Sequence, residues 1–387
     1  MLKAQTGTST NGNAALAAKE AVQKVKEVEN AKMAFVYSGV QYDQKALLDA
    51  IAAGLPGVPL VGNTSFTGVI TQEGFVSGDE GFVGVMAMGD EDMTVGVYGM
   101  AKEGTARETG KKVAQEALKR AGKTTAPDYF YMTAPPGEEE LYLKGITEVI
   151  GRVPFFGGSA ADNAIAGEWL LYTDEMVTAD GVAVAFFYTG KGFANEYTGA
   201  YEETDKVGII TKVVDNRTLA EIDGVPALKK YQEWTGASDE DVAGGNLLAY
   251  AITAPLGVKD PLGDVVAIRH PMNGNDDGSM AIGNNLAEHT AVILMEGSVD
   301  ELIQSTGETL DALKAKLGEG PAAFHLVHCG GRRAGIGDRN DEVAKALKEA
   351  SGGVPFMTEF TFGEYGYEDD SKNTCGGLML SFTAFGK

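Results

Sequence analysis

The chain is poor in cysteine, in histidine and in long apolar runs. It has two cysteines, Cys329 and Cys375, among 387 residues, which excludes a disulfide-stapled scaffold and fits a reducing compartment. Its four histidines show no HExxH spacing, and no CxxC pair occurs, so we expect no structural metal. No uncharged apolar run approaches the ~20 residues that span a bilayer. We therefore expect no membrane insertion.

Basic residues are also scarce. The chain has 32 Lys and Arg against 55 Asp and Glu, a formal net charge of −23, which repels phosphate backbones and anionic membranes and argues against nucleic acid as a partner. The N-terminal stretch MLKAQTGTSTNGN lacks the apolar segment of a secretory signal, so we expect a cytoplasmic protein. Neither a GxxxxGK[ST] loop nor a GxGxxG turn is present, and we expect no ATP, NAD or other cofactor.

What the chain does contain is one pattern used three times: an apolar strand-like run, a polar loop, a helical stretch, then Val-Pro and a second apolar run. The copies read AKMAFVYSGVQYDQKALLDAIAAGLPGVPLVGNTS, PDYFYMTAPPGEEELYLKGITEVIGRVPFFGGSAA and AAFHLVHCGGRRAGIGDRNDEVAKALKEASGGVPFMTEFT. The spacing from strand end to Val-Pro is 20 residues for Ser38 and Val58, 20 for Thr133 and Val153, and 25 for Cys329 and Val354. This indicates a repeated strand-helix-strand unit. Ligands often bind at such strand-end loops, although Val-Pro is also simply a common way to open a strand.

Other segments set the fold class. Apolar residues at helical spacing predict helices over 13–29, 106–121 and 299–317. Short runs divided by Gly and Asp predict hairpins over 69–100 and again before residue 200. Helices interleaved with hairpins exclude a purely parallel sheet. We therefore predict an α/β to α+β fold with mixed sheets, interleaved helices and repeated strand-helix-strand units. We also predict two similar-sized halves, 1–200 and 201–387.

Cys329 has two interpretations. It ends the apolar run AAFHLVH and precedes Gly-Gly-Arg-Arg, so neighbouring guanidinium groups favour a lowered thiol pKa and a nucleophile. A single cysteine in an apolar strand is otherwise a small buried hydrophobic residue. Strand alternation places His328 on the opposite face and leaves His325 four residues deeper, so no base is fixed beside the thiol.

Three further features suggest a small-ligand site. The loop GGRRAGIGDR places arginines in an acidic chain, and guanidinium groups bind carboxylates in bidentate fashion. The turn Gly157-Gly158-Ser159 offers bare backbone amides. Glu364 follows a Thr-rich strand and suits a ligand amine, although a strand-end carboxylate in water is the alternative. The candidate ligand-binding residues are Gly62, Thr64, Ser65, Gly157, Gly158, Ser159, Asp162, Cys329, Arg332, Thr361, Gly363 and Glu364; no catalytic residue is assigned.

These segments resemble the FIST sensory family over nearly the whole chain. GTSTNGNAALAAKEA, VPLVGNTSFTG and VPFFGGSAADN are similar to its N-terminal domain, expected over 1–200. VVDNRTLAEIDGVPALKKY, AIRHPM with a DDGS turn, HCGGR and FTFGEYG are similar to its C-terminal domain, expected over 201–387. The family tends to place His-Asn-x-Thr before the last strand, where this chain has SKNTCGG; the role of Asn373 and Thr374 therefore stays open.

The resemblance implies an intracellular signal-transduction module that binds a small ligand, such as an amino acid or a related small carboxylate. It also implies a separate signalling partner, because the chain carries no recognisable output domain and binding by itself only shifts a conformational equilibrium. Two other classes remain open: a hydrolase or transferase that uses Cys329, and an acidic scaffold that docks a protein. The identity of the ligand and the oligomeric state are not predicted.

Overall fold

The computed structural model describes residues 1–259, 266–318, 320–367 and 373–387. Most of them form three copies of one unit, which together make up the core lobe, defined as residues 1–198 and 299–387. The first unit comprises β1 (Lys3–Ser9), α1 (Ala14–Val25), β2 (Ala31–Ser38), α2 (Gln44–Gly54), β3 (Leu60–Thr64), β4 (Val69–Thr71), β5 (Gly74–Val76) and β6 (Val83–Gly89). The second comprises β7 (Thr94–Ala101), α3 (Ala106–Arg120), β8 (Tyr129–Ala134), α4 (Glu139–Ile150), β9 (Phe155–Ser159), β10 (Leu171–Thr173), β11 (Met176–Thr178) and β12 (Gly181–Tyr188).

The third unit is interrupted after its first strand by a separate segment, the inserted lobe, defined as residues 202–296. The unit comprises β13 (Phe193–Thr198), α7 (Val299–Leu317), β22 (Pro321–Cys329), α8 (Gly330–Ile336), α9 (Asn340–Ser351), β23 (Phe356–Thr361), β24 (Glu364–Tyr367), β25 (Asn373–Gly376) and β26 (Leu380–Gly386). The inserted lobe comprises β14 (Glu202–Val214), β15 (Thr218–Ile222), β16 (Val225–Pro226), α5 (Ala227–Thr235), α6 (Leu248–Ala251), β17 (Leu256–Lys259), β18 (Val266–Arg269), β19 (Pro271–Gly274), β20 (Met280–Ile282) and β21 (Ala291–Glu296).

Local sequence explains the helix boundaries. At the start of α7 the Ser298 hydroxyl accepts the backbone N–H of Glu301, and the Glu301 carboxylate accepts the backbone N–H of Ser298. This capping box satisfies amides that a helix start leaves without partners. The helix ends at Leu317 and is capped by Gly318, whose φ of 72° suits glycine. The helix predicted over 299–317 is confirmed, as are those predicted near 13–29 and 106–121.

The three units build three six-stranded sheets with one topology. Their strand orders are β1-β6-β2-β3-β10-β11, β7-β12-β8-β9-β24-β25 and β13-β26-β22-β23-β4-β5. In each sheet the Val-Pro strand pairs in parallel with the strand before its helix, and the other pairs are antiparallel. The prediction of mixed sheets with interleaved helices and repeated units is confirmed.

Each unit donates its hairpin to a neighbouring sheet. The hairpin β4–β5 of the first unit pairs with β23 of the third. The hairpin β10–β11 of the second unit pairs with β3 of the first, and β24–β25 of the third pairs with β9 of the second. The exchange is cyclic, so the three units cover one another's sheet edges.

The strand register corrects one detail of the repeat. In the three parallel pairs the residues that follow Val-Pro, namely Leu60, Phe155 and Phe356, lie opposite Ala34, Phe130 and Phe324. Counting forward from those partners, Ser38 is equivalent to Ala134 and His328. The predicted set of Ser38, Thr133 and Cys329 is therefore off by one residue in the second and third units. A one-residue shift reverses the face on which a strand side chain lies.

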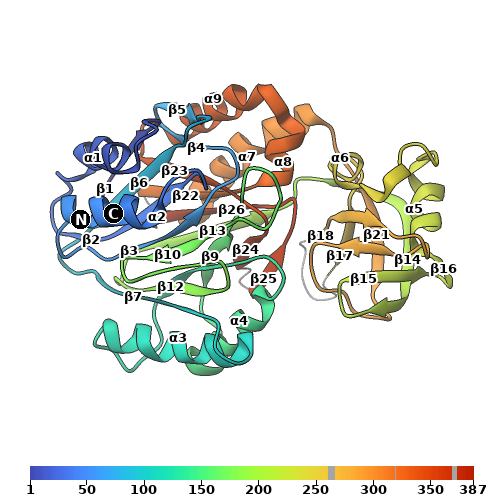
Figure 1. The fold of residues 1–387 in the computed structure, drawn as a ribbon, viewed down its shortest axis with the longest axis horizontal. Helices are drawn as coiled ribbons and strands as arrows, with labels where there is room; N and C mark the ends of the chain where they lie inside the picture. Colours follow the sequence, from blue (N-terminus) through green and yellow to red (C-terminus); the bar gives the residue numbers. More distant parts are fainter. Residues whose placement is uncertain (260–265, 319, 368–372) are drawn as a thin grey trace.

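The layers of the core lobe follow from this arrangement. Helices lie outside the sheets, with α3 and α4 on one side and α7, α8 and α9 on another (Figure 1). The inner faces of the three sheets share one apolar cluster that includes Phe35, Tyr131, Phe156 and Met357. Burial of these large side chains at about 25 cal/mol per Å² drives the closure of the units around a common centre.

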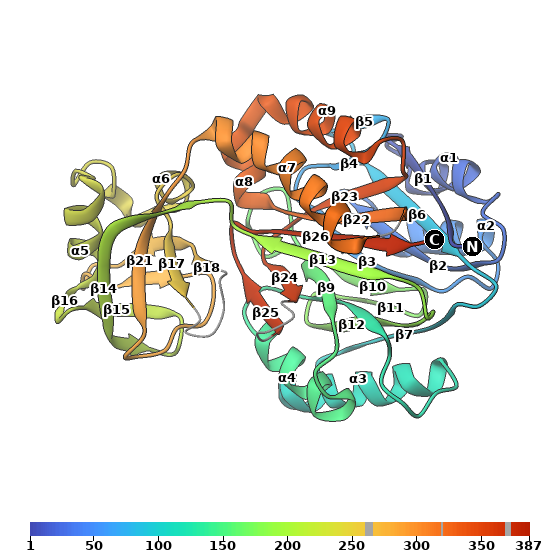
Figure 2. The ribbon, with the colours of Figure 1, turned by 180° about the vertical axis from the view of Figure 1, so that it is seen from behind.

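The inserted lobe stands to one side of the core lobe and has a core of its own. Two extended stretches of chain join the lobes, one leading into β14 and one leaving β21 (Figure 2). Its eight-stranded sheet encloses a separate apolar cluster that includes Ile210, Tyr231, Leu256 and Met280. The predicted boundary near residue 200 falls where the chain leaves β13 for this lobe. After the lobe the chain returns to the core lobe, so residues from both predicted halves share its sheets.

We predict that residues 1–200 alone do not form a cooperatively folded protein. In that fragment β4, β9 and β13 lose their partners β23, β24 and β26, and the shared inner cluster loses part of its apolar surface. Near-ultraviolet circular dichroism during thermal unfolding measures this. The full chain is the control, and a sharp melting transition of the fragment would contradict the prediction.

Candidate functional site

Strand-end segments of the three units meet at one end of the core lobe. The Ala161 N–H donates to the Thr64 carbonyl at 2.8 Å, and the Ser159 N–H donates to the Gly363 carbonyl at 2.7 Å. The Ser65 hydroxyl accepts the backbone N–H of Phe360 at 2.9 Å. Because these bonds link three distant parts of the chain, the structure brings together most of the predicted ligand-binding residues. We call this group, Thr64, Ser65, Gly157–Ser159, Cys329, Thr361, Gly363 and Glu364, the tip cluster.

The glycines of this region serve close packing of the backbone. A Cβ atom at Gly62 would lie 1.7 Å from the Val36 carbonyl oxygen, and one at Gly157 would lie 2.0 Å from that of Met132. A Cβ at Gly158 would lie 2.6 Å from the Thr361 side chain. Only glycine permits these approaches. Their amides line strand contacts and are not free to surround a ligand.

The Cys329 thiol lies inside the tip cluster. Its sulfur accepts the backbone N–H groups of Gly331 and Leu378, each at 3.2 Å. Burial raises the pKa of Cys329, and the nearby Glu364 carboxylate raises it further. A buried thiol with a raised pKa is a poor nucleophile, so the environment of Cys329 opposes the cysteine-enzyme alternative.

Glu364 is also buried within the tip cluster. Its carboxylate accepts the Thr361 hydroxyl at 2.9 Å and the Met379 N–H at 2.9 Å. Burial raises the pKa of Glu364 to about 8, so this carboxyl group is largely protonated at neutral pH. The predicted carboxylate for a ligand amine is therefore held neutral and bonded inside the protein.

Arg332 and Asp162 have structural partners. The predicted Arg-rich loop is wrong, because Gly330–Ile336 forms the helix α8, capped by Cys329. Arg332 is buried and donates to the Gly199 carbonyl at 2.6 Å and the Leu302 carbonyl at 3.0 Å. The Asp162 carboxylate accepts backbone N–H groups of the loop that follows it, including those of Ala164 and Gly167.

A cavity of about 390 Å³ opens beside the tip cluster, where the two lobes meet. Its lining residues are Glu140, Leu143, Lys144, Thr147, Arg152, Arg269, Asn285, Asn373, Thr374 and Cys375. We call it the interlobe cavity. The tip cluster adjoins it through β24, because Glu364 and Tyr365 pair with Gly376 and Cys375 of β25. Its volume lies within the range of small-molecule sites.

The interlobe cavity concentrates positive charge in an acidic chain. Lys144 and Arg152 come from the core lobe, and Arg269 comes from the inserted lobe. Arg269 donates to the carbonyls of Asn285 and Ile268, both at 3.1 Å, and burial lowers its pKa. A guanidinium group that has lost water gains from an anionic partner.

Asn373 adds a polar group with spare capacity. Its amide nitrogen donates to the Val153 carbonyl at 2.8 Å, while its buried amide oxygen has no hydrogen-bond partner within the described part of the chain. Buried polar atoms without partners are uncommon and point to a missing partner. The sequence signal at Asn373 is its place in SKNTCGG, before the last strand, where the family tends to have His-Asn-x-Thr.

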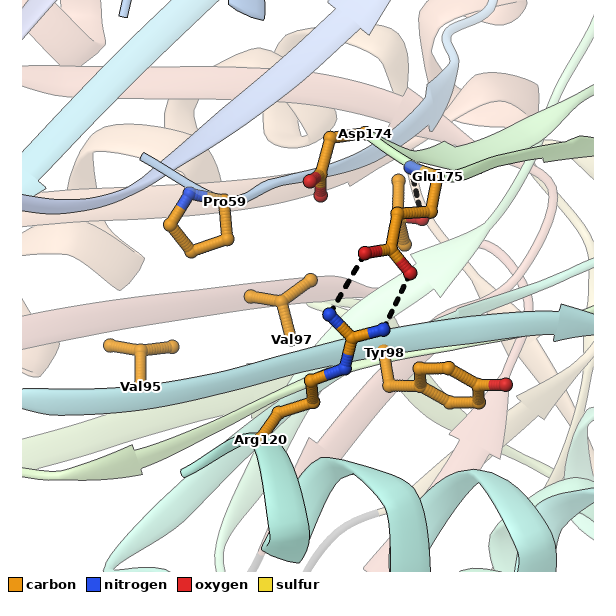
Figure 3. Close-up of a pocket in the computed structure, with 8 residues that line it drawn as sticks. Pro59, Val95, Val97, Tyr98, Arg120, Asp174 and Glu175 are labelled. Carbon is orange, nitrogen blue, oxygen red and sulfur yellow. Dashed lines mark hydrogen bonds and ion pairs between the residues drawn. The ribbon is translucent and has the colours of Figure 1, made fainter. Parts of the chain in front are cut away.

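A smaller cavity of about 150 Å³ lies at the opposite, Val-Pro end of the first unit. Its arginine, Arg120, is already bound in bidentate fashion by Glu175 and lies over the Tyr98 ring (Figure 3). The charge in this cavity is therefore neutralised from within. The interlobe cavity has three cationic side chains in its lining, Lys144, Arg152 and Arg269, and is therefore the better candidate for an anionic ligand.

A buried polar cluster at the centre of the core lobe was missed by sequence reasoning. The Tyr37 hydroxyl contacts His325 Nε2 and lies 3.3 Å from the Tyr131 hydroxyl. Tyr131 donates to Asn63 at 2.9 Å, and Asn63 donates to Glu359 at 2.9 Å. All three units contribute to this cluster, and all five side chains are fully buried.

The charges of this cluster follow from its burial. Burial raises the pKa of Glu359 to about 8 and lowers the pKa of His325 to about 3. Both groups are therefore neutral at pH 7, although Glu359 Oε1 lies 3.6 Å from His325 Nε2. The contact is one between neutral polar groups and not an ion pair.

The fold and the site define a two-lobed α/β protein with a polar cavity where the lobes meet. The chain belongs to the FIST family: the model of the FIST N domain matches residues 32–225, and that of the FIST C domain matches residues 227–367. FIST domains are generally regarded as small-ligand-binding sensor domains of signal transduction. The two matches meet inside the inserted lobe, near β16.

The comparison with curated proteins gave no match. The chain is similar to cyanuric acid hydrolase from A. caulinodans, with 11% identity, a TM-score of 0.37 and all of both chains covered. It is also similar to phosphoribosylformylglycinamidine synthase II from Thermotoga maritima, with 11% identity, a TM-score of 0.23, and 100% of this chain and 72% of that chain covered. Likeness at this level carries no inference about activity. No helix among the described residues combines the length and the hydropathy needed to cross a bilayer.

Replacement of Glu359 should change how stability depends on pH. Because the folded-state pKa of about 8 lies above the ordinary value of 4.5, the native protein holds a proton that the unfolded chain releases. Its free energy of unfolding should fall as pH rises from about 5 to about 8, by up to ~1.4 kcal/mol per pH unit for this group. Urea denaturation should show a shallower fall in Glu359→Gln.

Glu349, whose side chain is 70% exposed, provides the matched control, and Glu349→Gln should keep the slope of the wild type. Equal slopes for Glu359→Gln and the wild type would contradict the assignment of a neutral, buried Glu359.

Native Cys329 should resist alkylation. The residue is 4% exposed, and burial raises the pKa of its thiol, so little thiolate is available to react with the reagent. Iodoacetamide followed by peptide mass spectrometry should label Cys329 slowly in native buffer and rapidly in urea. Rapid native labelling would restore the cysteine-enzyme alternative.

Proposed function

We propose that this protein is a small-ligand sensor and that its ligand is a small carboxylate, such as an amino acid, bound in the interlobe cavity. The observation that carries the proposal is the convergence of Lys144, Arg152 and Arg269 on one cavity in a chain of net charge −23. Arginine binds carboxylates through paired, charge-assisted hydrogen bonds. Such a site attracts anions, although the negative net charge of the rest of the molecule repels them.

The cavity also suits the other end of an amino acid. Glu140 offers a carboxylate to an amine, and Asn373 and Thr374 offer neutral acceptors and donors. The amide oxygen of Asn373, which has no hydrogen-bond partner among the described residues, would gain a hydrogen bond from a ligand N–H group. This gives Asn373 and Thr374 a role at the ligand.

In this proposal the tip cluster acts from behind the cavity. Glu364 and Tyr365 of β24 hold β25, which carries Asn373 and Thr374. The remaining predicted residues fix the strand ends against one another. Direct ligand contact by the tip cluster stays a prediction, and it would require its buried segments to separate.

We also propose that a separate signalling protein receives the signal, as the resemblance to a sensory family implies. Ligand binding changes the surface that is presented to this partner only if the ligand favours one arrangement of the two lobes.

A thermal-shift screen of amino acids and small mono- and dicarboxylates should find a compound that raises the melting temperature, because binding to the native state alone stabilises it. Arg269→Met should weaken its binding at least about tenfold by calorimetry, since a buried charge-assisted pair contributes about 1.5–3 kcal/mol. Arg120→Met, which removes an arginine from the smaller cavity, is the matched control and should bind normally. A carboxylate that binds both variants equally well would exclude the interlobe cavity.

A further inference from the structure

A cluster of ions and amides joins the two lobes next to the interlobe cavity. Arg217, in the turn between β14 and β15 of the inserted lobe, places Nη2 2.8 Å from the Glu140 carboxylate and 3.2 Å from that of Glu139. Both acids lie in the first turn of α4 in the core lobe. We call Arg217, Glu139 and Glu140 the carboxylate clamp.

Amides of the inserted lobe support the clamp. Asn284 donates to Glu139 at 3.4 Å, and the backbone N–H of Asn285 donates to Glu140 at 3.3 Å. The Arg217 Nε–H donates to the Asn285 side chain at 3.2 Å. Two adjacent acids of one lobe therefore hold three residues of the other.

The clamp is largely withdrawn from water. Glu139 is 1% exposed, and its carboxylate also accepts the Gly137 N–H at 2.6 Å. Removing one member of a buried ion pair leaves an uncompensated charge and costs more than breaking a surface pair. Contacts of this kind fix geometry more strongly than solvated pairs do.

The chain connections between the lobes are narrow. Glu202 of β14 pairs with Glu296 of β21 where the two stretches cross side by side, and Arg332 holds the Gly199 carbonyl just before the crossing. Because the two connecting stretches lie side by side, they do not by themselves prevent rotation of the inserted lobe. Contacts away from these stretches must limit that rotation. The carboxylate clamp is one such contact.

The clamp and the interlobe cavity share residues. Glu140 and Asn285 line the cavity and belong to or support the clamp. The cavity arginines come from opposite lobes: Arg152 lies between α4 and β9 of the core lobe, and Arg269 lies in β18 of the inserted lobe. A carboxylate bound by both arginines would connect the lobes beside the clamp.

We propose that the carboxylate clamp sets the position of the inserted lobe on the core lobe, and that a carboxylate in the interlobe cavity adds a second tie that narrows the range of lobe positions. The ligand half of this inference rests on the proposed function; the clamp half does not. Ligand binding in the cavity thereby reduces the range of positions that the inserted lobe takes on the core lobe. A partner protein that binds both lobes responds to this change.

Distances between spin labels on the two lobes test the clamp. Lys119 on α3 and Asp205 on β14 have exposed side chains, and labels at Lys119→Cys and Asp205→Cys report the lobe separation by pulsed electron resonance; both native thiols are buried. Arg217→Met should broaden the distance distribution. Arg120→Met, which breaks an arginine–carboxylate pair within the core lobe, should leave it unchanged. An unchanged distribution in Arg217→Met would overturn the clamp.

Should Arg217→Met fail to fold, Glu139→Gln weakens the clamp from the core side and should broaden the distribution in the same way; no broadening overturns the clamp.

The ligand half uses L-glutamate and succinate as probes, one with an amine and one without. Saturation with a probe that binds by calorimetry should narrow the distribution of Arg217→Met back toward that of the wild type. Binding without narrowing would overturn the second tie and leave the proposed function standing. If neither probe binds, the second tie is overturned for these carboxylates, and the broader thermal-shift screen then decides the proposed function separately.

Discussion

The cyclic exchange of hairpins is the constraint on which the core lobe depends. Each unit completes its neighbour's sheet, with β4–β5 on β23, β10–β11 on β3, and β24–β25 on β9. The backbone N–H and C=O groups at the sheet edges have their hydrogen-bond partners only when all three units are present. The same closure places the inner faces of the sheets against one another and buries both the shared apolar cluster and the polar cluster of Tyr37, His325 and Glu359.

The position of the candidate site follows from this closure. Strand ends of the three units are drawn to one end of the core lobe, and their backbones bind one another there. That contact fills the place where the sequence suggested a ligand. It also projects β25 outward, against α4 and the inserted lobe, and the interlobe cavity forms at that junction. The site is thus a consequence of where the third unit's hairpin is placed and of where the inserted lobe is joined.

Charge gives the junction its chemistry. The chain is strongly acidic, yet Arg152 of the core lobe and Arg217 and Arg269 of the inserted lobe lie at the junction, where Arg217 pairs with Glu139 and Glu140 at the start of α4. Glu139 is buried, so little water screens its interaction with Arg217. Ligand recognition and lobe attachment therefore draw on the same few charged groups. In a sensor, such sharing lets one binding event change the relation between two lobes.

The sequence by itself determined the local features of this protein. Caps and apolar spacing placed α1, α3 and α7, the Val-Pro pattern gave the repeated unit, and the order of short motifs gave the family, because each signal resides in neighbouring residues. Arg217 and Arg269 lie within motifs that resemble the family, but their neighbouring residues pointed to no role for them or for Glu359. Only the tertiary structure decided that Gly157 serves backbone packing, that Glu364 is buried, and that α4, β18 and β25 enclose a cavity. Those outcomes depend on which distant sheet faces and edges bury one another, and that choice is made by the whole chain at once.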